Sequence, residues 1–294
     1  MGYLEDRAGL AGKVGIVVGG GGGLGRACAT DLGRAGVRLA LCDRNPDLLD
    51  ETVATLRADG AEVLARAFDA REPELLAGFF ESADEFLGQR LDVLVNVVGG
   101  TPQMAFADST PRIWDAVIRT NFTWLVQSCH LAIPPMRRSG GGSIVNLTSI
   151  EGHRAAPGFA VYAGMKAAVT NFGRTLAVEL GPDRIRVNTI APDMVPTEGI
   201  LAFQAARGEA PDPGLADAGL RIAVPMADRG SYEDIGGCAL FLASDLSRFV
   251  TGTSLHADGG TYASSGWFNW PGTGFSPVPP APAVAATQAA PPGA

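Results

Sequence analysis

A tyrosine and a lysine stand four positions apart in the segment Y-A-G-M-K, as Tyr162 and Lys166. On a helix this spacing puts both side chains on one face, where the ammonium can stabilise a phenolate. A free phenol titrates at about pH 10, so a tyrosine that is to accept a proton at neutral pH needs such a neighbour. Taken alone, the pair also fits two ordinary surface neighbours.

A serine lies thirteen residues before Tyr162, just after a predicted buried strand over 143–147. Ligands bind at the carboxyl ends of the strands in an open α/β sheet, so the hydroxyl of Ser149 can polarise a substrate oxygen there. The alternative is a serine that only closes a turn. His153 and Arg154 follow, either as contacts to a polar substrate group or as an exposed loop pair.

Glycines mark a second candidate site, at positions 19 to 23 and again at 25. They lie between a predicted buried strand, 14–18, and a predicted helix, 24–35. In this place glycines let the backbone approach a pyrophosphate, whose charge then meets the free amides of a helix N-terminus. A flexible linker has a similar composition, but it is not expected between a buried strand and an amphipathic helix.

Asp43 stands about twenty residues beyond this loop, after the second predicted strand. Its carboxylate can accept hydrogen bonds from the adenosine ribose hydroxyls and would repel a 2′-phosphate, which predicts NAD rather than NADP. A turn or helix-capping role is the alternative for Asp43. Arg44 either stacks on adenine, contacts a phosphate or is a solvated turn residue.

These residues need a scaffold, and the chain alternates apolar strand-like runs with helix-like segments. Such alternation predicts a single-domain α/β fold: a doubly wound, mostly parallel seven-stranded sheet flanked by helices, the Rossmann fold. Strands are expected at 14–18, 38–42, 62–68, 93–98, 143–147, 186–190 and 254–257, and helices at 24–35, 48–58, 74–87, 113–138 and 159–180.

The domain is expected to span residues 1–264, with a substrate lid at about 194–228. The tail, 265–294, is rich in Pro and Ala and is expected to be disordered from about 271. Trp267, Phe268 and Trp270 suggest a contact with a neighbouring subunit. The apolar side chains of the lid, which core packing would equally explain, are Met194, Ile200, Leu201, Phe203 and Met226.

Together these motifs resemble those of the short-chain dehydrogenase/reductase family, over about 10–262. Residues 18–25 look like the family's T-G-x-x-x-G-x-G turn, and residues 96–99 like its N-N-A-G. The serine and the Y-x-x-x-K segment resemble the family's catalytic residues. Asn121 matches the asparagine that in the family holds a water behind the lysine.

The resemblance implies an oxidoreductase that interconverts a secondary alcohol and a ketone. The apolar side chains of the expected lid, unless they only pack in the core, suggest a lipophilic or alicyclic alcohol. Tyr162 would take the hydroxyl proton as hydride leaves for the nicotinamide, and Ser149 would stabilise the reacting oxygen. Lys166 would lower the proton affinity of the tyrosine and bind the nicotinamide ribose. Asn121 and a water would connect the lysine to solvent.

The same resemblance implies how NAD is bound. Asp69 is expected near adenine, and the Val195 backbone and Thr197 near the carboxamide. The expected cofactor contacts are Gly19, Gly22, Gly23, Leu24, Gly25, Asp43, Arg44, Asp69, Ala70, Asn96, Gly99, Tyr162, Lys166, Pro192, Val195 and Thr197.

Four positions depart from the family pattern. Val18 replaces a threonine and Val97 an asparagine, which removes polar groups that brace the turn. Gly22 stands where a phosphate-binding serine is common, and Asp193 where the family usually has glycine. These changes bear on cofactor affinity and leave all four proposed catalytic side chains in place.

Two other functions are alternatives. A non-catalytic dinucleotide-sensing or scaffold protein of the same fold would need no proton relay, so the four side chains argue against it. A lyase or hydrolase that uses Ser149 with His153 lacks the G-x-S-x-G turn. His130, His153 and His256 have no metal-ligand spacing, so no metal site is expected.

Composition narrows the partners and the compartment. The 294 residues carry a net charge of -8 and no run of Lys and Arg, which predicts no nucleic-acid partner. No apolar stretch of about 18 residues and no signal-peptide pattern occur, so a cytoplasmic protein without a membrane span is expected. The four cysteines are expected to be reduced core thiols. Members of the family that the chain resembles are often tetramers. A homo-oligomer is therefore expected, either a tetramer or a dimer.

Overall fold

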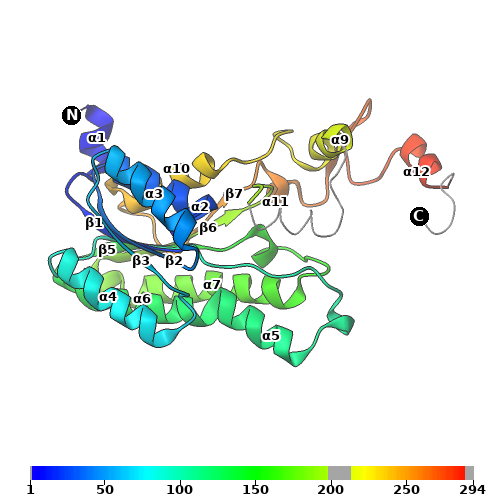
Figure 1. Cartoon of the computed structure of the whole chain (residues 1–294). Helices are drawn as coiled ribbons and strands as arrows, with labels where there is room; N and C mark the ends of the chain where they lie inside the picture. The colour runs from blue at the N-terminus through cyan, green and yellow to red at the C-terminus, as the bar shows by residue number, and fades with distance from the viewer. Residues whose placement is uncertain (1, 198–212, 289–294) are drawn as a thin grey trace.

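The fold is built on one sheet that lies between two helix layers (Figure 1). The computed structural model describes residues 2–197 and 213–288. Seven strands run parallel in the order β3-β2-β1-β4-β5-β6-β7. Their bounds are Val14–Val18 for β1, Arg38–Asp43 for β2, Val63–Ala67 for β3, Val93–Asn96 for β4, Gly142–Leu147 for β5, Ile185–Pro192 for β6 and Ser254–Ala257 for β7.

The strands are apolar because helices cover both faces of the sheet. Along β1, Ile16 and Val18 face one helix layer and Val17 faces the other, and all five residues of the strand are buried. A strand with two dry faces cannot alternate apolar and polar side chains. This explains the continuous apolar runs in the sequence.

Helices cover both faces of the sheet (Figure 1). Gly36 and Gly60, which follow α2 and α3, have a φ of 85°, the left-handed conformation that glycine adopts at little cost. Among the described helices, none has the length and apolar character that a membrane span requires. One layer holds α2 (Gly23–Arg34), α3 (Pro46–Ala58) and α10 (Tyr232–Ala243), and the other α4 (Pro73–Phe86), α6 (Trp124–Arg138) and α7 (Ala160–Glu179).

The strand order reverses at β1. The chain runs outward from β1 through β2 to β3 and then returns to place β4 on the other side of β1. At such a switch the loops at the carboxyl ends of the two central strands diverge and leave a crevice for a ligand. The glycine loop follows β1 and residues 97–100 follow β4, so both predicted segments lie at this crevice. The predicted doubly wound, seven-stranded Rossmann sheet is confirmed.

The helix predicted over 113–138 is interrupted. Helix α5 (Pro111–Ile118) is joined to α6 by a π-helical turn, Arg119–Thr123. Such a turn accommodates one extra residue and is frequent at functional sites. The apolar pattern continues on both sides of the turn, so the sequence gives no sign of the interruption.

The carboxyl-terminal segment carries regular structure where disorder was expected from about 271. Strand β8 (Phe268–Trp270) pairs with β9 (Gly274–Ser276), and α12 (Ala281–Gln288) follows. Gly272 and Gly274 have φ of 72° and 82°, which lets the chain reverse between the strands. The Pro- and Ala-rich composition does not predict such a turn, which is why disorder was expected. The last six residues of the predicted tail, 289–294, lie outside the described residues.

The predicted lid is described only in part. Helix α9 (Pro213–Ala223) belongs to it, whereas Ile200, Leu201 and Phe203 lie outside the described residues. Met226 is 76% exposed. The function of this segment as a lid stays a prediction.

We expect Gly25→Ala to destabilise the protein. A Cβ at Gly25 would lie 1.8 Å from the Gly19 carbonyl oxygen, and backbone cannot rotate aside as a side chain can. Overpacking of this kind costs about 1–3 kcal/mol, which thermal unfolding would register as a lower Tm.

Gly78→Ala, in the interior of α4, is the matched control. No atom lies within 4 Å of the Cβ that it would add. Because alanine favours a helix over glycine by about 0.5–1 kcal/mol, this variant should keep or raise the Tm. A Gly25→Ala variant as stable as the unmodified protein would contradict the close approach of the loop to α2.

Candidate active site

Three of the predicted catalytic side chains meet where β5 ends and α7 begins. Ser149 caps a short 3-10 helix, Ile150–Gly152, and Tyr162 lies in the first turn of α7. The Ser149 side chain lies close enough to the Tyr162 hydroxyl to lower the pKa of the phenol. Lys166 lies one turn further along, with Nζ 5.6 Å from the centroid of the Tyr162 ring. The two side chains share one face of α7, as their spacing predicts.

The ammonium of Lys166 is buried, with only 3% of the residue exposed. Its Nζ donates to the carbonyl of Leu147, the last residue of β5, at 3.0 Å. Burial disfavours the charged form and lowers the pKa of Lys166 from 10.5 to about 8. The group can therefore exchange its proton in mildly alkaline water.

The phenol of Tyr162 is shifted in the opposite direction, because burial raises its pKa to about 12. The Ser149 side chain acts against this rise in pKa, and the negative charge of Glu151 adds to it. At neutral pH the side chain is a phenol that can donate a proton. To accept one it needs positive charge close by, and the ammonium of Lys166 lies over its ring.

Asn121 lies in the π-helical turn and is fully buried. Its Nδ2 donates to the carbonyls of Val117 and Gly100 at 2.9 and 2.8 Å, and its Oδ1 accepts from the Gly100 N–H at 3.0 Å. A Cβ at Gly99 would lie 2.9 Å from both Asn121 Oδ1 and Lys166 Nζ. The two polar groups thus meet beneath Gly99, and the structure brings all four predicted catalytic residues into one region.

Asn96 is not brought to this region by its side chain. It ends β4 with no exposed surface, Nδ2 donates to Asn146 Oδ1 at 2.8 Å, and Oδ1 accepts from Ser128 at 2.7 Å. Asn96 continues the sheet face of Leu94, which packs toward α6. The interpretation of its side chain as a cofactor contact is therefore corrected to a structural role between β4, β5 and α6.

The glycine loop packs closely against its neighbours, at positions where side chains would clash. A Cβ at Gly19 would lie 2.8 Å from the Val98 side chain, and one at Gly21 would lie 2.8 Å from Asp43. Gly22, the N-cap of α2, has no side chain to cap the helix, which leaves the N–H groups of Gly23 and Leu24 for an anion, whereas the Gly25 N–H donates to the Gly22 carbonyl at 3.1 Å. The predicted contacts Gly22, Gly23, Leu24 and Gly25 all belong to this turn.

Other groups brace the loop where the family's threonine is missing. The Val97 N–H donates to the Val18 carbonyl at 2.9 Å, so backbone atoms join the two departures from the family pattern. Thr52, on α3, donates to the Gly21 carbonyl at 2.7 Å and accepts from Arg26 at 3.0 Å. Sequence reasoning missed Thr52 because 31 positions separate it from the loop.

Asp43 accepts hydrogen bonds both from the glycine loop and from the turn that follows β2. Its Oδ2 accepts from the Gly21 N–H and its Oδ1 from the Asn45 N–H, both at 2.9 Å. A carboxylate has about four acceptor sites, so two remain for other donors such as ribose hydroxyls. Arg44, next in the chain, is exposed.

Asp69 lies in the loop after β3, and its carboxylate is already paired. Arg71 Nε donates to its two oxygens at 2.9 and 3.0 Å, and these hydrogen bonds lower the pKa of Asp69. Ala70, between them, is buried. A donor from adenine would have to share the Asp69 carboxylate with Arg71.

The segment after β6 holds the remaining predicted cofactor contacts. Pro192 ends the strand and Val195 is buried, while Thr197 is the last described residue before 213. Between them, the Asp193 carboxylate accepts from the Thr261 hydroxyl at 2.8 Å. Burial raises the pKa of Asp193.

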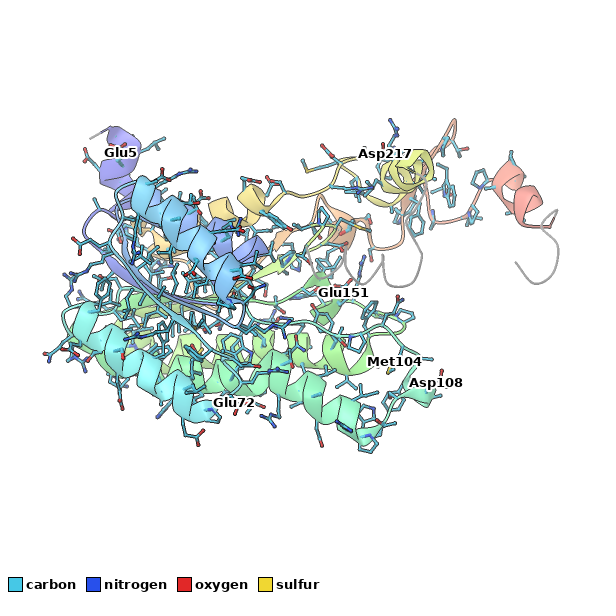
Figure 2. All side chains as sticks on the ribbon, viewed as in Figure 1. Glu5, Glu72, Met104, Asp108, Glu151 and Asp217 are labelled. Atoms are coloured by element: carbon cyan, nitrogen blue, oxygen red, sulfur yellow. The ribbon has the colours of Figure 1, made fainter. Side chains whose placement is uncertain are left out.

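Glu151 is a site residue that the sequence did not reveal. It lies at the end of the sheet from which α5 and α9 extend (Figure 2), and its Oε2 accepts a hydrogen bond from Ser149 Oγ. The signal available was its position two residues after the strand-end serine. Arg154 donates to Glu151 Oε1 at 3.1 Å and lies 3.3 Å from Asp193 Oδ2.

A cavity of about 380 Å³ adjoins these groups. Glu151, Arg154 and Asp193 supply its charged lining, and Phe159, Met194 and Phe268 are among its apolar walls. Phe159 also packs edge-on against Tyr162, with ring centroids 6.3 Å apart. Phe159 therefore lies between the cavity and the Tyr162 ring, and Phe268 of β8 supplies part of the opposite lining.

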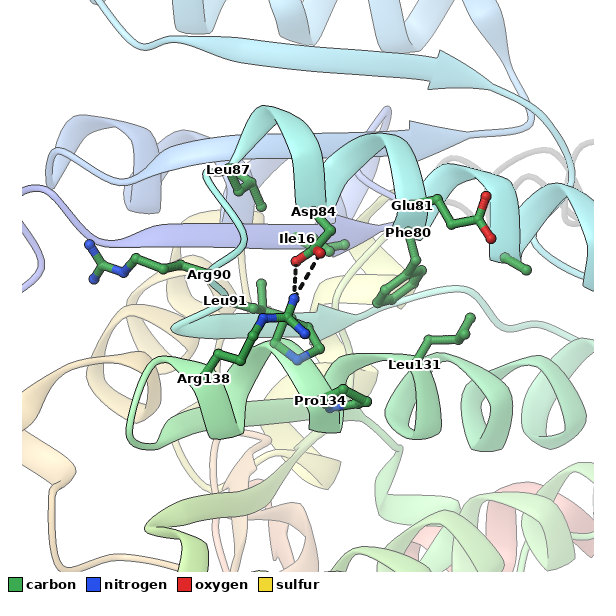
Figure 3. Close-up of a pocket in the computed structure, with 12 residues that line it drawn as sticks. Ile16, Phe80, Glu81, Asp84, Leu87, Arg90, Leu91, Leu131, Pro134 and Arg138 are labelled. Carbon is green, nitrogen blue, oxygen red and sulfur yellow. Dashed lines mark hydrogen bonds and ion pairs between the residues drawn. The ribbon is translucent and has the colours of Figure 1, made fainter.

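A second hollow, of about 200 Å³, lies between α4 and α6 (Figure 3). Arg138 crosses it to meet both oxygens of Asp84 at 2.6 and 2.7 Å. Its walls include Leu87 and Leu91, which precede β4, so it lies at the amino ends of the strands. The predicted catalytic groups lie at the opposite ends, and this hollow takes no part in the site.

The cysteines and the potential metal ligands form neither a disulfide nor a metal cluster in the described part of the chain. Burial raises the pKa of Cys28 and Cys129 to about 12, and that of Cys42 as well, and all four cysteines are free. Across residues 2–197 and 213–288, no group of three or more His, Cys, Asp or Glu is arranged to hold a metal ion.

Comparison with known proteins finds that the chain is similar to oxidoreductases. A family model described as enoyl-(acyl carrier protein) reductase matches residues 19–262. An uncharacterized oxidoreductase of Mycobacterium tuberculosis is 37% identical over 263 residues, which are 87% of this chain and 95% of the relative. A 2,5-dichloro-2,5-cyclohexadiene-1,4-diol dehydrogenase of Sphingobium indicum is 32% identical over 258 residues, 85% and 96% of the two chains.

Solved structures share the fold over nearly their whole length. A short-chain type dehydrogenase/reductase from Mycobacterium ulcerans superposes with a TM-score of 0.78 at 28% identity, over 86% of this chain and 90% of that one. A 7α-hydroxysteroid dehydrogenase complexed with NADH and 7-oxo glycochenodeoxycholic acid gives 0.80 at 28% identity, over 88% and 98%. A carveol dehydrogenase from Mycobacterium avium in complex with NAD gives 0.78 at 30% identity, over 86% and 98%. The chain belongs to the short-chain dehydrogenase/reductase family of Rossmann-fold oxidoreductases.

Proposed function

We propose that the protein is an NAD-dependent oxidoreductase that interconverts a secondary alcohol and a ketone, with Tyr162 as the general acid and base. The observation that carries the proposal is the placement of the Tyr162 phenol close to Ser149 and to the buried ammonium of Lys166. Two hydroxyls and a cation near a cavity suit the transfer of one proton to or from a substrate oxygen.

The glycine loop and Asp43 would hold the dinucleotide. Open amides at the start of α2 suit the pyrophosphate, and the free acceptor sites of Asp43 suit the adenosine ribose. Because Gly99 has no side chain, it does not cover Lys166 and Asn121. The nicotinamide ribose would lie there. The cofactor, when bound, supplies the hydride acceptor for oxidation and the hydride donor for reduction.

In oxidation, the Ser149 hydroxyl would turn from Glu151 to donate to the substrate oxygen while Tyr162 takes the substrate's proton. The ammonium of Lys166 lowers the free energy of the phenolate that this step needs. Lys166 can then pass a proton to a water that Asn121 would help to hold, and the Asn121 amide is itself fixed by the Gly100 backbone. In reduction the same groups act in reverse, and the neutral phenol of Tyr162 protonates the forming alkoxide.

The cavity supports a substrate with substantial apolar surface. Phe159, Met194 and Phe268 face it, which suits a lipophilic or alicyclic alcohol. The structural neighbours named for carveol and hydroxysteroids, and the cyclohexadiene-diol dehydrogenase among the relatives, act on alicyclic compounds according to their names. We propose that this chain takes a substrate of the same kind.

Tyr162→Phe should abolish turnover and preserve NAD binding. General acid–base catalysis contributes about 10²–10⁴-fold to a rate, so kcat should fall by at least about a hundredfold. Initial rates of NADH formation at 340 nm and a fluorescence titration with NADH measure the two properties. Tyr3→Phe, on an exposed side chain of α1 (Tyr3–Ala8), is the control. Turnover that survives in Tyr162→Phe would refute the assignment.

Asp43→Asn should narrow the preference for NAD over NADP. The carboxylate repels a 2′-phosphate, whereas an amide keeps one acceptor for the Gly21 N–H and carries no charge. Removing one like charge should improve NADP binding relative to NAD by about tenfold. Calorimetric Kd values for both cofactors test this. Asp47→Asn, an exposed side chain four positions on, should leave the ratio unchanged.

Lys166→Met should remove a pH-dependent part of the stability. The pKa of Lys166 is about 8 in the fold, against 10.5 for the free side chain, so the unfolded chain binds more protons between these values. The free energy of unfolding therefore rises with pH over this range, by about 3 kcal/mol from this group. Urea unfolding at several pH values should show that the free energy of unfolding of the unmodified protein rises relative to that of the variant between pH 8 and 10.5. A difference that stays constant would contradict the burial of the charge.

A further inference from the structure

The cavity beside Tyr162 has a polar wall that the proposed function leaves unused. Glu151, Arg154 and Asp193 are the ionisable residues among its lining. Their side chains are 20%, 39% and 11% exposed, so two of the three are largely withdrawn from water. Asp193 is also the position where the family usually has glycine, which makes this wall a feature of this sequence.

A chain of contacts fixes the wall in place. Ser149 Oγ donates to Glu151, Arg154 donates to Glu151 at 3.1 Å, and Arg154 lies 3.3 Å from Asp193. Thr261 donates to the same Asp193 oxygen, Oδ2, at 2.8 Å. Held at both ends, the carboxylates need little reorganisation to receive a ligand.

The charges of the wall do not cancel. Two carboxylates and one guanidinium leave one negative charge, and Arg154 already serves both acids. An anionic substrate group would meet this excess negative charge in a partly dehydrated cavity, where like charges repel strongly. A neutral hydroxyl, in contrast, can donate to a carboxylate oxygen and form a charge-assisted hydrogen bond.

We infer that this wall selects vicinal diols, with Glu151 receiving the hydroxyl next to the one that reacts. Oxygens on adjacent carbons are about as far apart as two hydrogen-bonded oxygens, and Glu151 is hydrogen-bonded to Ser149. A substrate oxygen held by Ser149 and Tyr162 therefore places its neighbour within reach of Glu151. The inference rests on the proposed function and names its substrate class.

The reaction balances as an ordinary oxidation. The carbinol C–H bond breaks and its hydride passes to NAD, while the O–H bond breaks and its proton passes to Tyr162. The products are an α-hydroxy ketone, NADH and one proton. The second hydroxyl keeps its proton and only donates a hydrogen bond to Glu151.

Three ring substrates that differ in one group test the inference on the full chain with NAD. These are 1,2-cyclohexanediol, cyclohexanol and 2-hydroxycyclohexane carboxylate, and the measurement is kcat/KM from absorbance at 340 nm. A hydrogen bond to a charged group should favour the diol over cyclohexanol by about tenfold or more, and the carboxylate should be the poorest substrate. Equal values for the diol and cyclohexanol, or a preference for the carboxylate, would overturn the inference.

Two variants assign the effect to the wall. In Glu151→Gln the ratio of diol to cyclohexanol should fall by about tenfold, and in Asp193→Asn the carboxylate should improve relative to cyclohexanol. Glu179→Gln, an exposed residue at the far end of α7, should keep all ratios. Because ratios are compared, a general loss of rate in a variant does not disturb the test. An unchanged diol ratio in Glu151→Gln would remove Glu151 from the assignment.

Failure of the proposed function gives a different result. If none of the three compounds yields NADH with the unmodified protein, while NADH binding is detected by fluorescence, the alcohol-oxidising function itself is contradicted. If cyclohexanol is oxidised as fast as the diol, the function stands and the diol inference falls.

Discussion

The buried ammonium of Lys166 is the constraint that organises the rest of the site. A charge removed from water must be hydrogen-bonded and tightly surrounded, and here the end of β5 provides the Leu147 carbonyl while Gly99 and Asn121 close in from the other side. The residue can only be held there if α7 packs against the end of β5. That packing is also what brings Tyr162 against Ser149. One unfavourable burial thus fixes the geometry of the two hydroxyls.

Signals that are local in the sequence were enough to predict much of this arrangement. The glycine loop, the strand that precedes it and the four-residue spacing of Tyr162 and Lys166 each depend on neighbours within one or two turns of chain. Thr52 and Asn96 depend instead on which helix covers which face of the sheet, and a linear pattern does not carry that information. The inward aim of Asn96 follows from strand parity once α6 is known to lie on that face.

Two networks of polar side chains differ in role: one joins elements of the scaffold and the other lies beside the cavity. Asn96, Ser128 and Asn146 satisfy one another between β4, β5 and α6, although the Nδ2 of Asn146 has no partner. Near the cavity, Glu151 and Asp193 are paired through Arg154 rather than neutralised by separate cations. The first network only links elements of the scaffold. The second leaves acceptor capacity facing a space that a ligand can enter, which is why it can discriminate among ligands.

The π-helical turn at 119–123 has a consequence for how the chain can change over time. An α-helix advances about 100° per residue, so removing the extra residue would rotate α6 by that angle relative to α5. Leu125, Cys129 and Met136 would then swing off the sheet at the same moment as Asn121 lost its inward aim. The orientation of the Asn121 amide and the rotation of α6 about its axis therefore depend on the same turn. An insertion or deletion at this turn would thus disturb the site and the packing of α6 at once.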